Sequence, residues 1–201
     1  MPKLSLPHLE RFITLLHNVQ RVKRFVHRPG ETRPSNTGEH TFELAMMCWY
    51  IAQCEGLDLD QEKILKYALA HDLVEAYAGD TPAYDTDGQK DKAEREHAAL
   101  KRIEQEFSEF PELIASIKAY EEKADKESVF VYAVDKIVDP LGVSLETTET
   151  HWKRYGVTYR DMRQYKDAKI SKHSLIQAYW EELCTKFEEK QDFYFAPENK
   201  D

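Results

Sequence analysis

Apolar positions recur at intervals of three and four residues along most of this chain, which is the repeat of an α-helix. Between residues 64 and 76 the repeat is carried by Ile, Leu and Ala side chains. Residues 37–55 are apolar on nearly every face, which is typical of a buried helix, whereas residues 91–107 carry a narrow stripe and predict an outer helix. The pattern predicts an all-α protein with helices over 6–24, 37–55, 60–79, 91–107, 111–120 and 129–141.

Polar residues, glycine and proline mark the ends of these helices. Asn36 and Glu39 have the spacing of an N-terminal capping box, and they follow a loop marked by Pro29-Gly30. Without internal repeats or an interdomain linker, residues 1–201 are expected to form one domain. Its parts are expected to be a core at about 6–145, an extension with one loop and one long helix at about 146–190, and a flexible tail at 191–201.

Composition supports a globular chain, since 41% of the 201 residues are apolar and 32% are charged. No stretch approaches the roughly 20 apolar residues needed to cross a bilayer, and the first residues lack the pattern of a signal peptide. Three cysteines without a CxxC pair suggest neither disulfides nor a cysteine zinc site, so we expect a cytoplasmic protein with no membrane partner. A net charge of −9 argues against nucleic-acid polymers but not against a small anionic substrate.

The apolar run from Tyr67 to Ala78 contains three ionisable residues, His71, Asp72 and Glu75. On a continuous helix, His71 and Glu75 lie one turn apart on one face. Buried charge is costly unless it is paired or bound to metal, and imidazole with carboxylate suits a divalent transition ion. Taken alone, the pattern more often marks a hydrogen-bonded core histidine beside a solvated acidic face.

Two other predicted helices offer further ligands. His40 lies in the first turn of the 37–55 helix, where a lone histidine is often a cap or a surface residue. Asp135 lies amid apolar residues of the 129–141 helix, where a carboxylate requires a cation or several donors. The predicted ligands of one divalent transition ion, such as Mn²⁺ or Co²⁺, are therefore His40, His71, Asp72 and Asp135.

The order H…HD…D resembles the signature of the HD-domain superfamily of metal-dependent phosphohydrolases, which carry it on a bundle of helices. A closer resemblance, over about residues 9–145, is to the bacterial 5′-deoxynucleotidases. The matching motifs are Glu39-His40, His71-Asp72-x-x-Glu75 and Gly79-Asp80-Thr81-Pro82. The resemblance implies a single HD-domain helical bundle, usually a homodimer. It also matches Arg24-Phe25 to an arginine–aromatic pair whose aromatic residue is usually tryptophan.

The chemistry of these residues suggests their roles. A metal ion lowers the pKa of its water and offsets charge on a phosphoryl group. Glu75 can orient that water or manage a proton, and the planar guanidinium of Arg24 matches a phosphate. Asp80 could assist catalysis and accept a hydrogen bond from a sugar hydroxyl, or simply end the helix. Lys136 could approach the phosphate or be solvated, and the resemblance assigns Phe25 to the sugar.

The preferred function is a metal-dependent phosphomonoesterase that hydrolyses (deoxy)nucleoside 5′-monophosphates to nucleoside and phosphate by metal-activated water. A deoxynucleoside triphosphate triphosphohydrolase is a second candidate, because the basic cluster between Arg21 and Arg33 suits a longer anion. A third is a non-catalytic nucleotide-sensing module, which the presence of Glu75 disfavours. No serine or cysteine lies in a convincing setting for a nucleophile, so direct attack by water is favoured.

Overall fold

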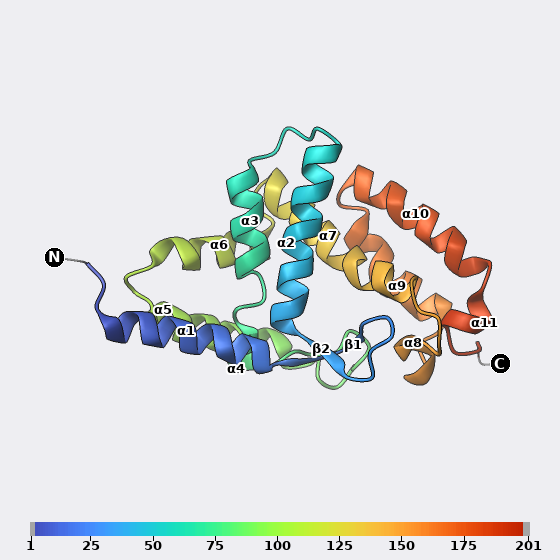
Figure 1. The fold of residues 1–201 in the computed structure, drawn as a ribbon, viewed down its shortest axis with the longest axis horizontal. Coiled ribbons are helices and arrows are strands. Elements are labelled where there is room, and N and C mark those ends of the chain that lie inside the picture. Colours follow the sequence, from blue (N-terminus) through green and yellow to red (C-terminus); the bar gives the residue numbers. More distant parts are fainter. Residues whose placement is uncertain (1–2, 199–201) are drawn as a thin grey trace.

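The computed structural model describes residues 3–198, whose secondary structure is helical, as predicted, apart from a small two-stranded sheet. The elements in chain order are α1 Leu6–Arg21, β1 Lys23–His27, β2 Pro34–Asn36, α2 Thr37–Cys54, α3 Gln61–Ala70, α4 Glu75–Ala78, α5 Lys92–Glu106, α6 Pro111–Glu122, α7 Lys126–Val143, α8 His151–Arg154, α9 Tyr159–Ile170, α10 Ser174–Glu188 and α11 Gln191–Tyr194. Figure 1 shows α2 in the middle of the molecule, with α1, α5 and α6 to one side and α8 to α11 to the other. In the described part of the chain, no helix is long and apolar enough to span a membrane.

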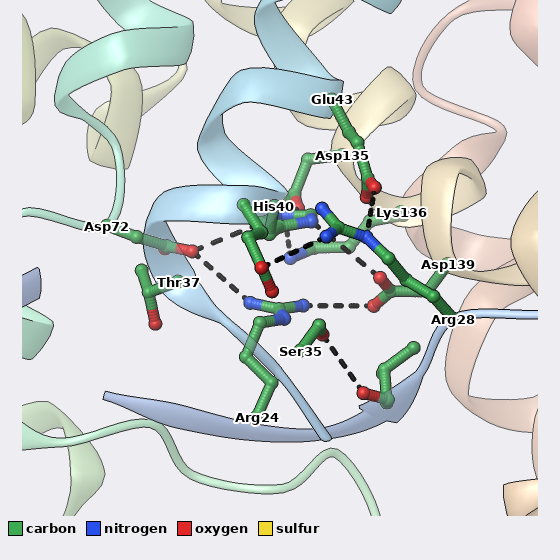
Figure 2. Close-up of polar contacts among 12 residues, drawn as sticks. Arg24, Arg28, Ser35, Thr37, His40, Glu43, Asp72, Asp135, Lys136 and Asp139 are labelled. Atoms are coloured by element: carbon green, nitrogen blue, oxygen red, sulfur yellow. Dashed lines mark hydrogen bonds and ion pairs between the residues drawn. The ribbon is translucent and has the colours of Figure 1, made fainter. Parts of the chain in front are cut away.

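The first helix is shorter than its sequence predicts. α1 ends at Arg21, and the residues expected to continue it form β1, which pairs antiparallel with β2. Val22 already has extended backbone angles, and the aromatic and branched side chains of Phe25 and Val26 favour a strand. The prediction of helix to residue 24 is wrong because helical periodicity carries no information about pairing with residues further along the chain. Arg24 consequently projects from a strand that runs beneath the start of α2 (Figure 2).

α2 begins where the capping box predicts. The Glu39 amide donates to Asn36 Oδ1, and the Asn36 amide donates to Glu39 Oε2, each at 3.0 Å. The inner side of the helix, including Leu44, joins the main core with α7. Phe42 and Trp49 on its outer side are exposed, so the expectation of a fully buried helix is only partly correct.

The helix predicted to carry both His71 and Glu75 is interrupted between them. α3 ends at Ala70 and α4 begins at Glu75, with a tight turn in which the Glu75 amide donates to the Asp72 carbonyl three residues back, at 3.0 Å. The Ala68 carbonyl, which the Asp72 amide would reach in a continuous helix, accepts a 2.8 Å hydrogen bond from His71 Nδ1. The prediction of one continuous helix is therefore wrong, because a buried side chain competes for its backbone acceptor.

The C-terminal third folds into α8 to α11 rather than one loop and one long helix. Phe195, which is 2% exposed, stacks on Trp152 with 5.2 Å between ring centroids. The Ala196 amide also donates to the Val157 carbonyl at 2.9 Å. Instead of the expected flexible tail from residue 191, the structure has α11 and a packed Phe195, because these aromatic side chains complete a core, while residues 199–201 lie outside the described part.

Candidate metal centre

His40 and His71 meet beside the first turn of α2, with 5.4 Å between their ring centroids. Both rings are buried, and His40 Nε2 lies 2.9 Å from Asp135 Oδ1 of α7. The Asp72 carboxylate approaches the same nitrogen at 4.0 Å. Figure 2 shows Asp72 and Asp135 reaching His40 from different segments of the chain. The four residues predicted as ligands from three distant stretches of sequence are thus neighbours in space.

The protonation of His71 follows from its surroundings. Its Nδ1 lies 2.8 Å from the Ala68 carbonyl, which can only accept, so Nδ1 carries the proton. The buried Nε2 makes no hydrogen bond, yet it lies 2.9 Å from Asp72 Oδ2. A lone pair facing a carboxylate oxygen at this distance requires a cation between or beside them, which a second proton or a metal ion can provide.

The set of donor atoms fits a divalent transition ion. His40, His71 and Asp72 each offer one ligand atom, and these atoms lie within 4.8 Å of one another. Asp135 adjoins them through Oδ1, while its Oδ2 accepts hydrogen bonds from Tyr120 Oη at 3.0 Å and Lys136 Nζ at 2.5 Å. Burial alone would raise the pKa of Asp135, but Lys136 and His40 hold it well below its usual value, so the carboxylate stays ionised. Two imidazoles and two carboxylates form a mixed N/O ligand set that suits Mn²⁺, Co²⁺ and similar ions.

Arg24 reaches this cluster from β1. Its guanidinium donates to Asp139 Oδ2 at 3.0 Å and lies 3.5 Å from Asp72 Oδ2 (Figure 2). Asp139 also faces His40, with 3.7 Å between its Oδ1 and Nδ1 of that ring. Burial opposes ionisation of Asp139, but Arg24 and His40 nevertheless lower its pKa to about 2. The arginine is therefore held by anions on both sides, immediately beside the candidate ligands.

Glu75 is 4% exposed and lies at the start of α4. Its Oε2 accepts a 2.7 Å hydrogen bond from Thr37 Oγ1, the first helical residue of α2. Burial, reinforced by the carboxylates of Asp72 and Asp80, raises the pKa of Glu75 well above its usual value. A carboxyl group in this setting can carry a proton at a pH where an exposed glutamate cannot.

The remaining predicted site residues line one cavity of about 110 Å³ that opens onto the cluster. Asp80 lies in its wall, just after Gly79, whose positive φ of 74° ends α4. Burial raises the pKa of Asp80 in spite of the nearby Arg24. Lys136 and the half-exposed Phe25 also line the cavity. All the residues proposed for substrate binding are consequently within one enclosure.

The other arginines of the basic cluster lie elsewhere. Arg28 donates to Glu43 at 2.7 Å and contacts Glu39 at 3.1 Å. Arg33 makes two hydrogen bonds to Glu39, at 3.1 and 2.7 Å. These side chains are neutralised on the outer side of α2, so of this cluster it is Arg24 that reaches the cavity.

Sequence reasoning missed several cavity residues. Asp139 could have been found, because it follows Asp135 by one helical turn and so shares its face of α7. Thr37 carries no such signal, since its role depends on meeting Glu75 from a distant segment. Lys92 of α5 and Lys166 of α9 also line the cavity, and burial lowers the pKa of Lys166 to about 8. Their charges converge only through tertiary packing.

Buried histidines and aspartates are thus gathered between the helices of a mainly helical domain. Comparison with protein families identifies this domain: the HD-domain model matches residues 16–180, and the chain belongs to this family. The match extends well past residue 145, so the helices α8 and α9 and part of α10 fall within the family's domain.

Individual relatives are consistent with this assignment. The 5′-deoxynucleotidase HDDC2 of Mus musculus is 30% identical over 132 residues, which is 64% of this chain and 64% of that protein. HDDC2 of Homo sapiens is also 30% identical over 132 residues, with 64% and 63% covered. The match therefore spans slightly less than two thirds of these relatives. A crystal structure of a predicted metal-dependent phosphohydrolase from Magnetospirillum magnetotacticum has a TM-score of 0.81 and 26% identity, over 96% of this chain and 98% of that one.

Proposed function

We propose that this chain is a metal-dependent phosphomonoesterase that converts (deoxy)nucleoside 5′-monophosphates to nucleosides and inorganic phosphate. One observation carries the proposal: His40, His71 and Asp72 offer ligand atoms within 4.8 Å of one another, beside the guanidinium of Arg24. A divalent ion and an arginine at one cavity are suited to stabilising the charge of phosphoryl transfer. The names of the HDDC2 relatives and of the Magnetospirillum structure support the same class of reaction.

The ion would be held by His40, His71, Asp72 and Asp135. One divalent transition ion, Mn²⁺, Co²⁺ or similar, supplies Lewis acidity when bound, by lowering the pKa of the attacking water and neutralising charge on the phosphoryl oxygens. The backbone hydrogen bond at Nδ1 orients His71 for this task, since it directs the Nε2 lone pair at the cluster.

The protein's own groups position the ester. Arg24, anchored by Asp139, presents its remaining N–H donors to a phosphate oxygen, and Lys136 adds a second positive charge. Thr37 occupies Oε2 of Glu75, so Oε1 is the atom available to orient water or to give a proton to the departing sugar oxygen. Asp80 accepts a hydrogen bond from a sugar hydroxyl and Phe25 packs against the sugar ring.

A triphosphate substrate is the second candidate, because Lys92 and Lys166 add positive charge to the same cavity. The enclosure of about 110 Å³ favours a monophosphate, however, and Arg28 and Arg33, which suggested a longer anion, are paired with glutamates outside it. A non-catalytic sensor has no need of a buried Glu75 beside the ligands.

A single assay distinguishes these candidates. Mn²⁺-loaded protein is incubated in parallel with a deoxynucleoside 5′-monophosphate and the corresponding triphosphate, and the products are identified. Release of inorganic phosphate from the monophosphate is expected. Release of intact triphosphate from the longer substrate would instead establish the triphosphohydrolase, and stoichiometric binding without any product would indicate a sensor.

The proposal includes a homodimer located in the cytoplasm. In support of a self-association surface, α2 exposes Phe42, Met46 and Trp49, which recur at four- and three-residue intervals along one side of the helix. Sedimentation equilibrium is expected to give twice the chain mass. Replacing Trp49 with Glu should shift that mass towards the monomer, and an unchanged mass would remove this face from the dimer.

A further inference from the structure

A second cavity, of about 270 Å³, opens beside the first. Phe25, Asp139 and Lys166 belong to the walls of both, so the two cavities adjoin. We call the second cavity the side chamber and define it by the residues that it does not share with the first: Tyr84, Asp85, His151, Trp152, Tyr155 and Val157. Most of these belong to α8 and the residues after it, so the C-terminal third builds an enclosure next to the candidate metal centre.

His151 is the unusual residue of the side chamber. It is 4% exposed, and neither of its ring nitrogens has a hydrogen-bond partner. Burial lowers its pKa to about 4, so the ring is neutral near pH 7 and offers one N–H donor and one nitrogen acceptor. The buried hydroxyl of Tyr84, in the same wall, also lacks a partner. Buried polar groups are nearly always hydrogen-bonded to protein, water or ligand, so these atoms can receive the polar groups of a molecule in the side chamber.

The other walls of the side chamber are aromatic. Phe25 and Tyr155 meet edge to face, with 5.6 Å between ring centroids, and each is about half exposed. Trp152 forms a buried wall whose far side is fixed by Phe195. Aromatic faces of this kind bind planar rings by stacking, and they do so largely irrespective of which base is presented.

Tyr84 is carried by a loop that is held in place. The Arg95 guanidinium of α5 donates to the Ala78 carbonyl at 2.7 Å, to Thr81 Oγ1 at 2.9 Å and to the Gly88 carbonyl at 3.1 Å. These bonds fasten both ends of the loop to one helix. The side chamber is therefore bounded on one side by this loop, which Arg95 anchors, and on the other side by α8.

We propose that the side chamber is the nucleobase site of this protein, in which His151 hydrogen-bonds the polar edge of the base while the phosphate lies at the metal centre. This inference rests on the proposed function and specifies how the substrate is recognised. The volumes of the two adjoining cavities together lie near the lower end of the ~300–1,000 Å³ typical of small-ligand sites, which suits a mononucleotide. Asp139 and Lys166, at the junction, then flank the sugar that connects base to phosphate.

The first test replaces the imidazole of His151 with an aromatic ring that has no polar atoms. His151→Phe is expected to lower kcat/KM for 2′-deoxyadenosine 5′-monophosphate and thymidine 5′-monophosphate by about tenfold, the usual consequence of losing a buried hydrogen bond. Hydrolysis of 2-deoxyribose 5-phosphate, which has no base, should be unchanged. Tyr84→Phe, which removes only a hydroxyl, provides a second variant if His151→Phe folds poorly.

The matched control is His173→Phe, because His173 also has an unpartnered ring nitrogen but packs on Phe130 outside both cavities. His173→Phe should hydrolyse all three substrates with the same kcat/KM as the unaltered protein. If His151→Phe and Tyr84→Phe leave the preference for nucleotides over 2-deoxyribose 5-phosphate unchanged, the base-site assignment is overturned while the phosphomonoesterase proposal stands.

The second test does not depend on turnover. In protein treated with a chelator, 2′-deoxyadenosine is expected to shift the ¹⁵N resonances of the His151 ring, which are identified by their absence in His151→Phe. 2-Deoxyribose should leave them in place. A nucleoside-induced shift in a protein that hydrolyses no monophosphate would support the base site and refute the proposed function, whereas no shift at saturating nucleoside would refute the base site.

Discussion

His71 donates its Nδ1 proton to the Ala68 carbonyl, which fixes the tautomer and leaves the Nε2 lone pair facing Asp72. Mutation of a group that orients a ligand histidine in this way commonly lowers metal affinity by about 10–100-fold. For His71 the partner is the backbone carbonyl of Ala68, in the last turn of α3, where the helix is interrupted. The geometry of the candidate ligand and the local break in α3 are consequently one structural feature.

Glu75 provides the first test of chemistry at this scale. We expect Glu75→Gln to lower kcat by about 10²-fold or more, because the amide keeps the size and the Thr37 hydrogen bond but cannot exchange a proton. Metal content, measured by elemental analysis, should remain that of the unaltered protein. Glu43→Gln, at a carboxylate outside the cavity, is the control, and near-normal turnover of Glu75→Gln would leave Glu75 with a structural role only.

Arg24 provides the second test of chemistry at the residue scale. Arg24→Ala is expected to raise KM and lower kcat/KM for a nucleoside monophosphate while metal content stays normal, because the guanidinium lies beside the ligands without being one. Arg24→Lys should recover only part of the loss, since an ammonium cannot reproduce the planar fork. Arg28→Ala is the matched control, as Arg28 pairs with Glu39 and Glu43 away from the cavity. A defect in Arg28→Ala without one in Arg24→Ala would show that the phosphate site has been assigned to the wrong arginine.

At the scale of elements, the candidate ligands join three segments: α2 contributes His40, the turn after α3 contributes His71 and Asp72, and α7 contributes Asp135. A metal that bridges these segments binds the folded chain and not the unfolded one. Its binding energy is therefore added to the stability of the packing between the helices.

Removal of the metal should accordingly lower thermal stability. An ion present at 100 times its dissociation constant stabilises the native state by about 2.7 kcal/mol, which for a domain of this size corresponds to a loss of about 5–10 °C in Tm on chelation. Differential scanning calorimetry with and without EDTA measures it. His71→Ala should no longer respond to added Mn²⁺, and stoichiometric binding with unchanged affinity in that variant would disprove the ligand assignment.

At the scale of the whole molecule, the C-terminal third is part of the folded domain rather than an appendage. Phe195 closes an aromatic cluster in which its ring centroid lies 5.2 Å from that of Trp152 and 5.6 Å from that of Phe187. Trp152 in turn is a wall of the side chamber. Packing at the end of the chain therefore supports a cavity adjoining the candidate metal centre.

Phe195→Ala tests this packing. Truncation of a buried phenylalanine costs about 3–5 kcal/mol, so the free energy of unfolding in urea should fall by that amount. Leu145→Ala is the control: Leu145 is 65% exposed, and such surface changes usually stay within about 0.5 kcal/mol. A loss for Phe195→Ala no larger than that of the control would mean that this end of the chain is frayed in solution.

Local signals allowed much of the structure to be predicted from the sequence. The Asn36–Glu39 capping box set the start of α2, because both partners lie within one turn of the chain. The positions of α5 and α6 followed from periodicity in the same way. His71, Asp72 and Asp135 were identifiable because charged groups in apolar helices are costly unless something compensates them.

Only the tertiary structure decided how those residues are completed. The β1–β2 pairing brings Arg24 to the cluster. The hydrogen bond from Thr37 to Glu75 and the wall that His151 adds join segments far apart in sequence. No local periodicity encodes such contacts, because they depend on how whole helices pack. The sequence thus determined which groups need a partner, and the packing of α2, α7 and the C-terminal helices determined where each partner lies.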